Sequence, residues 1–399
     1  MTDLLLVLLA LLVGLPALSL LTLTVAALRK PGAPGNPDAI AAEGKSYPRI
    51  AVLVPAHNES AHVLPTIASI RHQLGPADRL VVVADNCTDD TAVLARAAGA
   101  EVVERHAAAQ RGKGYALAFG VDHLRASPPD VVLVVDADCT LSENAVARIG
   151  QRCHASGRPV QMLNLMSAPP QAELRLRILA FAMLMKNLVR PLGSYRLGKA
   201  CHLMGTGMAL PWPLMASARL ATGHIAEDVK LGVELAVAGH APQFLPEARV
   251  SSAFPLDTDV ARVQKSRWEH GHLAILTEEL PGLVAATVRT GRPALLALTL
   301  DLLIPPLALY VLVLAAANAI GLAAAWLLAA WHPANTLLLL SGMGTAAAIS
   351  LGWCFFGRHL LSGRELLRTP LYALWKIPVY VAFFLRRKSG WIRTRRENE

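Results

Sequence analysis

The sequence predicts an α/β domain with a mostly parallel sheet, flanked by transmembrane helices. The 399 residues are 54% hydrophobic and only 17% charged, whereas soluble domains carry about 25% charged residues. The apolar excess gathers in roughly the first thirty residues and the last hundred. Between them, short β-branched runs alternate with amphipathic segments of helical length, which is typical of βαβ units. We therefore expect one water-soluble domain between membrane segments.

The apolar segments predict three membrane spans, within residues 1–30 and 293–358. Leu4–Leu28 is longer than a signal-peptide core and has no clear cleavage site, so we expect a retained helix. Leu295–Trp331 has the length of one span with an additional interfacial turn, and Thr336–Phe356 predicts the last span.

Basic residues predict the orientation. Arg29 and Lys30 follow the first span, and Arg358 and Arg364 follow the third. The turn between the second and third spans has no Lys or Arg. Because positive loops stay on the cytoplasmic side, the sequence predicts a multi-pass protein of the inner (plasma) membrane with its central domain facing the cytosol.

The net charge of +9 lies mostly beside the apolar blocks, which favours anionic lipid over nucleic acid as a partner. Ala172–Leu197 predicts a basic amphipathic helix on the membrane surface, with a core helix of the central domain as the alternative. Leu371–Leu385, in the basic segment 364–399, predicts an interfacial helix and not a fourth span. The five cysteines lack a CxxC pair, which indicates a reducing compartment and no structural zinc.

Four strands are predicted in the central domain, which we place at 48–280. They are Arg49–Val54, Leu80–Ala84, Glu101–Glu104 and Val131–Val135. In parallel sheets ligands bind beyond the carboxyl ends of the strands, and acidic residues follow three of these four. The sequence has no Gly-x-Gly-x-x-Gly at the first helix and no P-loop motif, which argues against dinucleotide and P-loop folds.

Asp136-Ala137-Asp138 follows the most hydrophobic predicted strand. Carboxylates at i and i+2 on extended chain point the same way, which suits one hard divalent cation shared with phosphate oxygens. Such an ion would neutralise a diphosphate leaving group. The alternative is that the two acids only cap a turn or helix.

Three further motifs have candidate roles. Lys113 at a helix start opposes the helix dipole and indicates a nearby anion, unless it is a solvated loop lysine. Asp228 begins a predicted helix and has a simple N-cap as its alternative role. Gln264, Arg267 and Trp268 share one helical face and offer an aromatic plane for a sugar and a cation for phosphate. An interfacial tryptophan is the alternative there.

The order of these motifs resembles the membrane-bound, processive-type members of glycosyltransferase family 2. That group includes cellulose, chitin and hyaluronan synthases and the ceramide-glucosyltransferase-like enzymes. The resemblance covers about residues 48–271 and implies a GT-A-type nucleotide-sugar-binding fold. The residues that carry it are Pro55-Ala56-His57-Asn58-Glu59, Asp85, Lys113, Asp136-Ala137-Asp138, Gly205-Thr206-Gly207, Glu227-Asp228 and Gln264-x-x-Arg267-Trp268.

The resemblance implies roles for these residues. A UDP-sugar donor would be bound by Pro55, Asn58, Glu59, Asp85, Lys113 and Asp136. Of these, Glu59 and Asp85 would hold uracil and ribose, and Lys113 would lie near the diphosphate.

Mg²⁺ or Mn²⁺ would bind Asp138 together with Asp136. Asp228 would be the general base of an inverting displacement. The acceptor and the diphosphate would be contacted by Glu227, Gln264, Arg267 and Trp268.

The implied function is sugar transfer to a growing glycan or lipid-linked acceptor in envelope or exopolysaccharide synthesis, with partners in an export complex. Cys201–Gly207 replaces the Phe-Phe-Cys-Gly-Ser/Thr loop of several polymer synthases, and no gating-loop pattern follows Trp268. Processive and single transfer therefore both stay open.

Three other functions are alternatives. Single-sugar transfer to a membrane lipid suits the basic amphipathic segments equally well. An inactive scaffold of a secretion complex would not need the complete set of acids. A soluble-type nucleotidyltransferase would need neither the tryptophan motif nor the membrane segments.

Overall fold

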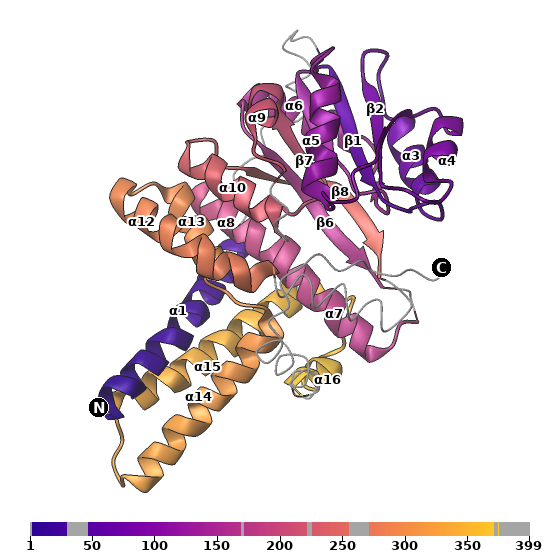
Figure 1. Ribbon diagram of the computed structural model, residues 1–399. Coiled ribbons are helices and arrows are strands. Elements are labelled where there is room, and N and C mark those ends of the chain that lie inside the picture. Colours follow the sequence, from indigo (N-terminus) through magenta and orange to yellow (C-terminus); the bar gives the residue numbers. More distant parts are fainter. Residues whose placement is uncertain are drawn as a thin grey trace. The chain divides into compact units, whose positions relative to one another are not determined.

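The chain folds as two compact units in the computed structural model, one α/β and one helical (Figure 1). The structure describes residues 2–29, 47–168, 171–221, 226–254, 271–370 and 374. The α/β unit is formed by the described residues of Lys30–Ser167 and Lys199–Ala261. The helical unit is formed by those of Met1–Arg29, Ala168–Gly198 and Arg262–Gly390.

The described part of the α/β unit contains one eight-stranded sheet in the order β3-β2-β1-β4-β7-β6-β8-β5. The four predicted strands are confirmed with ends that differ by at most two residues: β1 (Ile50–Ala56), β2 (Arg79–Asp85), β3 (Glu101–Arg105) and β4 (Val131–Val134). The sequence did not predict β5 (Thr140–Leu141), β6 (Val160–Ser167), β7 (Met208–Pro211) and β8 (Gln243–Ala253).

Most strand pairs are parallel, as predicted, and β7 is the exception that shapes the site. Strands β1 to β4 pair in parallel, and so do β6 and β8. β7 is antiparallel to both β4 and β6, and β5 is antiparallel to β8. Because β7 is antiparallel, its first residue Met208 pairs with Val134 at the end of β4. The loop that enters β7 therefore lies beside the Asp136-Ala137-Asp138 motif.

Helices cover both faces of the sheet. One apolar cluster joins β1 residues such as Val52 to α3 (Val63–Arg71), α4 (Thr91–Ala97) and α6 (Ala145–Ser156). The other joins Leu53 and its neighbours to α5 (Lys113–Leu124), α9 (Trp212–Ser217) and α10 (Glu227–Val237). Alternate residues of a strand point to opposite faces, so a sheet covered on both sides needs continuous apolar runs.

The helical unit contains α1 (Thr2–Leu28), α7 (Leu174–Leu184), α8 (Arg190–Gly198), α12 (Leu280–Thr290), α13 (Pro293–Leu302), α14 (Leu307–Leu327), α15 (Pro333–Gly352) and α16 (Gly363–Leu366). Three described helices are long and apolar enough to cross a membrane, at Asp3–Leu28, Leu307–Leu327 and Pro333–Gly357. They lie side by side (Figure 1) and share an apolar core. The Tyr310 hydroxyl in α14 donates to the Val13 carbonyl oxygen in α1 at 2.7 Å.

The predicted span in Leu295–Trp331 is split into two helices. α13 has only 10 residues, and α14 begins as a separate helix at Leu307. Pro305 and Pro306 lie at the break. Proline lacks the backbone N–H that a continuous helix needs and disfavours helical conformation in the residue before it. The additional segment is therefore a separate short helix, and its interfacial position stays a prediction.

The predicted amphipathic segment Ala172–Leu197 is helical and belongs to the helical unit. α7 continues through a π-helical turn, Met185–Val189, into α8. The alternative, a core helix of the α/β domain, is wrong, because α7 and α8 pack in a cluster with residues of α1 and α15. That it lies on a membrane surface stays a prediction. The predicted helix Leu371–Leu385 falls almost entirely outside the described residues, and the predicted domain limits stay predictions.

Two contacts fix α8 within its unit. A Cβ on Gly193 would overlap the Leu23 carbonyl oxygen, so this glycine allows α8 to lie directly against α1. Arg190 donates from Nε to Asp301 Oδ1 and from Nη2 to the Asp301 carbonyl oxygen, both at 2.6 Å. Both side chains are buried, so this ion pair joins α8 to α13.

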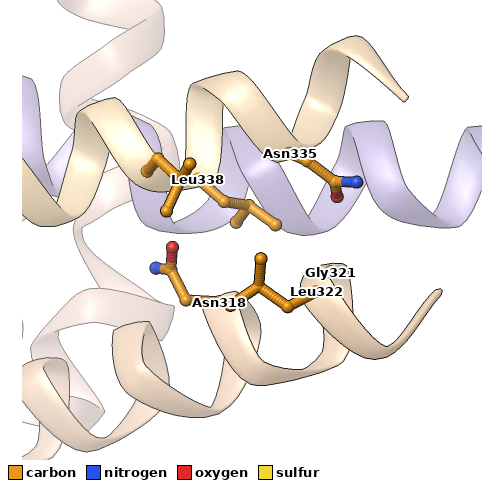
Figure 2. Close-up of a pocket in the computed structure, with 6 residues that line it drawn as sticks. Asn318, Gly321, Leu322, Asn335 and Leu338 are labelled. Carbon is orange, nitrogen blue, oxygen red and sulfur yellow. The ribbon is translucent and has the colours of Figure 1, made fainter. Parts of the chain in front are cut away.

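A shallow crevice lies between α14 and α15 (Figure 2), where Asn318 and Gly321 of one helix face Leu338 and Asn335 of the other. The side-chain amide of Asn335 is buried, and neither its nitrogen nor its oxygen has a hydrogen-bond partner among the described residues. None of the residues that line the crevice is titratable. It therefore offers no acid or base, and the candidate active site lies elsewhere.

Candidate functional site

The loops after β1 and β2 are joined by a pair of side-chain hydrogen bonds. Asn58 accepts at Oδ1 from the Thr88 amide at 2.7 Å and donates from Nδ2 to Thr88 Oγ1 at 3.1 Å. The Glu59 amide donates to Thr91 Oγ1 at 2.8 Å. Pro55 lies in β1 beside Val83 of β2. The predicted donor residues of both loops thus lie together at the carboxyl edge of the sheet.

Asp85, the last residue of β2, is held by partners that the sequence did not reveal. Arg105 donates to Asp85 Oδ1 at 2.6 Å, and Asn86 Nδ2 donates to the same oxygen at 2.9 Å. Gln110 in turn accepts from Arg105 at its carbonyl oxygen (2.9 Å) and at Oε1 (3.0 Å). Because both charges are buried, the pair fixes the carboxylate rigidly in place.

Lys113 connects the acidic motif after β4 to the loop before β7. Its Nζ donates to Asp136 Oδ1 and, at 2.7 Å, to the Gly205 carbonyl oxygen. Burial lowers the pKa of Lys113, but the charges of Asp136, Glu227 and Asp228 outweigh burial and raise it. Lys113 is therefore a paired, charged ammonium. The alternative of a solvated loop lysine is wrong.

The Gly205-Thr206-Gly207 loop fits closely against the same motif. Thr206 Oγ1 accepts from the Asp136 amide at 3.0 Å, and the Gly207 amide donates to the Val134 carbonyl oxygen at 2.9 Å. Gly205 has φ of +80°, and a Cβ there would lie 3.2 Å from Asp228 Oδ2. Glycine is favoured at this conformation. Its small size lets the Asp228 carboxylate lie beside Lys113.

Asp228 is the second residue of α10, whose N-cap position is Ala226. Asp228 is therefore not the N-cap residue itself but lies in the first turn of the helix. Its carboxylate is near Gly205 and close enough to Lys113 to affect the pKa of that ammonium. The predicted base and the predicted diphosphate-binding lysine are thus brought together.

Glu227 is the neighbouring acid, and its environment favours the protonated form. Burial raises the pKa of Glu227 from 4.5 to about 7, and the charge of Asp228 acts in the same direction against the opposing charge of Lys113. Two adjacent carboxylates repel each other, and a single ammonium compensates only one negative charge, so protonation of one carboxylate is favoured. The Glu227 carboxyl therefore keeps its proton to a higher pH than an ordinary glutamate does.

We expect Glu227→Gln to weaken the pH dependence of stability between pH 4.5 and about 7. In this window the folded protein keeps a proton that the unfolded chain has lost, so wild-type stability falls as pH rises. Glutamine resembles the protonated form at every pH and removes this loss. The measurement is the melting temperature of the full chain across the window. Equal pH dependence in the two proteins would contradict the raised pKa of Glu227.

The residues after β4 fit a divalent cation. Donor atoms of Asp136, Asp138 and Cys139 lie within 4.8 Å of one another. Burial, followed by the charge of Asp138, raises the pKa of the Cys139 thiol. The thiol therefore stays protonated, and the two carboxylates are the donors that Mg²⁺ or Mn²⁺ prefers. The predicted acceptor residues Gln264, Arg267 and Trp268 lie outside the described residues, and their roles stay predictions.

A sheet of this topology, with paired acids after β4 and a basic residue beside them, defines the GT-A-like glycosyltransferase fold. The mannosyltransferase PcManGT from Pyrobaculum calidifontis, solved with GDP-Man and Mn²⁺, has this fold. It is 19% identical with a TM-score of 0.56, and the match covers 93% of this chain and 99% of that one.

The chain belongs to glycosyltransferase family 2: the family described as "Glycosyltransferase like family 2" matches residues 48–271. The predicted family is thus confirmed, and the predicted subgroup stays a prediction. A probable glycosyltransferase of Bacillus subtilis, YdaM, is 24% identical over 251 residues, which are 59% of this chain and 58% of YdaM. Glucosyl-3-phosphoglycerate synthase of Mycolicibacterium smegmatis is 38% identical over 95 residues, which are 22% of this chain and 30% of that enzyme. The chain thus spans less than two thirds of either relative.

Proposed function

We propose that this chain is a membrane-bound inverting glycosyltransferase that moves a sugar from a UDP-sugar to a glycan or lipid-linked acceptor. The observation that carries the proposal is the position of Lys113. Its ammonium contacts Asp136 and the Gly205 carbonyl, and Gly205 lies against Asp228. Residues suited to a diphosphate, to a cation and to a proton thus converge at one edge of the sheet.

In the proposed reaction, Asp228 accepts the proton of the acceptor hydroxyl as its oxygen attacks the anomeric carbon. The bond from that carbon to the diphosphate oxygen breaks, and the nucleoside diphosphate leaves with the electron pair. Lys113 places positive charge beside the leaving group, and the rigid Asp85–Arg105 pair orients the nucleoside. Most of the acceleration would come from position and charge stabilisation.

A divalent cation, Mg²⁺ or Mn²⁺, would be held by Asp138 with Asp136 and would supply further charge neutralisation at the diphosphate. We expect Asp138→Ala to lose divalent-ion-dependent transfer and to keep its fold, because a partly exposed side chain at a strand end contributes little packing. The assay is transfer against Mn²⁺ concentration, with melting temperature as the folding control. Normal metal-stimulated turnover in the variant would remove Asp138 from the site.

The donor and acceptor are tested together. Membranes with the full chain would be incubated with UDP-sugars and, as the alternative nucleotide, GDP-sugars. Release of UDP alone supports the proposal, and release of GDP alone would correct the donor. A short lipid-linked product indicates single transfer, whereas a long polymer indicates a processive enzyme. Absence of any nucleotide release would support the inactive scaffold.

The membrane location is proposed from the helical unit. Trp326, near the end of α14, and Trp331, in the turn between α14 and α15, are 81% and 55% exposed, as in the aromatic belt of membrane proteins. Exposed leucines such as Leu12 give α1 an apolar surface that suits lipid. Partners in a polysaccharide export complex remain part of the proposal.

Reporter fusions test the proposed topology. Because Arg29 and Lys30 follow α1, fusions after Ala42 and after Glu399 should both report a cytoplasmic location. A fusion in the turn between α14 and α15, at Ala329, is the matched control and should report the opposite side. A periplasmic signal at Ala42 or Glu399 would overturn the topology.

A further inference from the structure

Gln161 is a fully buried glutamine in β6 that the site described above does not include. It pairs with Met208, the first residue of β7, and its side chain is 0% exposed. A buried amide is costly unless its donors and acceptor find partners. The partners of Gln161 therefore indicate what holds it there.

The side chain of Gln161 binds the loop before β7 at several points. Its Nε2 lies 2.8 Å from the Thr206 carbonyl oxygen, 2.9 Å from that of Met162 and 3.2 Å from that of Gly207. Its Oε1 accepts from the Met204 amide at 2.8 Å. Both ends of the amide are therefore used, and three of the four bonds reach residues 204–207.

This loop is also the one that holds the site together. Gly205 accepts from Lys113, Thr206 accepts from the Asp136 amide, and the missing side chain of Gly205 leaves room for Asp228. A shift of the loop by a few tenths of an ångström would move the carbonyl that orients the Lys113 ammonium. The Gln161 side chain bonds to the loop and not to Lys113, Asp136 or Asp228, so it would act on them through the loop.

We infer that Gln161 is a positioning residue that sets the Lys113 ammonium for the donor diphosphate. The inference rests on the proposed function, because it assigns Gln161 to the same donor site. It predicts that the loss of the Gln161 side chain raises the KM for the donor, as the loss of the Lys113 side chain does. A residue with only a structural role would lower stability without this specific effect.

The test compares variants of the full chain. Gln161→Met keeps the volume and removes both ends of the amide. Gln161→Glu keeps an acceptor for the Met204 amide and, when protonated, one donor. Gln243→Met is the matched control, because Gln243 is buried on β8 next to Val160 and its Oε1 accepts from Arg152, away from the loop.

We expect Gln161→Met to raise the KM for the donor by about tenfold to a hundredfold with a smaller change in kcat, which is the scale of losing a buried hydrogen-bonded group. Gln161→Glu should lie between wild type and Gln161→Met and should recover as pH falls. Gln243→Met should leave the KM for the donor within about twofold of wild type, even where its melting temperature falls.

Two further measurements decide the result. In combination with Lys113→Met, Gln161→Met should add little, because both remove the same interaction and coupled residues are not additive. Amide hydrogen exchange should rise in the peptide that contains Met204–Met208 in Gln161→Met and not in Gln243→Met. This second readout does not need turnover and remains usable if a variant is too weak to assay.

The outcomes separate the inference from the proposed function. If the wild-type chain transfers sugar, two results would overturn the role of Gln161. One is an additive effect of Gln161→Met and Lys113→Met on the KM for the donor, and the other is unchanged amide hydrogen exchange in the loop of Gln161→Met. A wild-type chain that binds and transfers no nucleotide sugar would overturn the proposed function, and the donor role of Gln161 with it. Equal effects of Gln161→Met and Gln243→Met on the donor KM would show a structural role only.

Discussion

Asp228→Asn should reduce sugar transfer by about 10²-fold to 10⁴-fold, the usual contribution of a general base. Asparagine keeps the size of the side chain and most of its hydrogen bonds but cannot accept the acceptor proton. Nucleotide binding should survive, because the proposed donor contacts lie at Asp85, Lys113 and Asp136. The measurements are the initial rate at saturating donor and the binding constant of the nucleoside diphosphate.

The control for this change is Asp122→Asn on α5, where the side chain is 81% exposed. It should leave the transfer rate unchanged. Glu227→Gln distinguishes the two neighbouring acids, since a loss confined to that variant would make Glu227 the base. Transfer by Asp228→Asn within about threefold of wild type would exclude Asp228 from general-base catalysis.

Arg190→Met should lower the free energy of unfolding by about 3–5 kcal/mol, the cost of breaking a buried ion pair by removing one of its two charges. Asp301 is 5% exposed and would lose the Arg190 bonds to its carboxylate and to its carbonyl oxygen, although the Ile304 amide still donates to that carbonyl. The measurement is thermal or chemical unfolding of the full chain in detergent micelles or lipid nanodiscs.

The double variant Arg190→Met with Asp301→Leu is the informative partner to this experiment. Replacing both charges with apolar groups removes the buried carboxylate together with the buried guanidinium, so most of the lost stability should return. Arg175→Met, on the exposed part of α7, is the matched control and should change stability little. A double variant as unstable as Arg190→Met would show that the ion pair is not the source of the loss.

The first half of the sheet could be predicted because it is buried on both faces. β1 and β4 are continuous apolar runs, which buried parallel strands require. β7 is short and ends in Pro211, and β8 contains Pro246 and Glu247, so neither has the composition of a strand. These strands form because they pair with neighbouring strands in the sheet. Such long-range pairing cannot be predicted from the local sequence pattern.

The site was predictable where its chemistry is local in sequence. In Asp136-Ala137-Asp138 and in Glu227-Asp228 the acids lie within two residues of each other, and their positions after a strand and at a helix start were visible in the sequence. The Arg105–Asp85 pair spans 20 residues and the Lys113–Gly205 bond spans 92. Such partners depend on the order of strands in the sheet. For Arg105 the only local signal was an arginine at the end of a strand.

The glycine contact between α8 and α1 has a consequence for how this chain can be engineered or can diverge. A Cβ on Gly193 would overlap the Leu23 carbonyl oxygen, so α8 packs against the backbone of α1 as well as against its apolar side chains. A chimera in which residues 2–29 are replaced by an unrelated apolar helix would still be hydrophobic enough for a bilayer. It would nevertheless lose the crossing point with α8, because close packing of helix backbones depends on register. The first helix is thus a specific structural partner and not an interchangeable anchor.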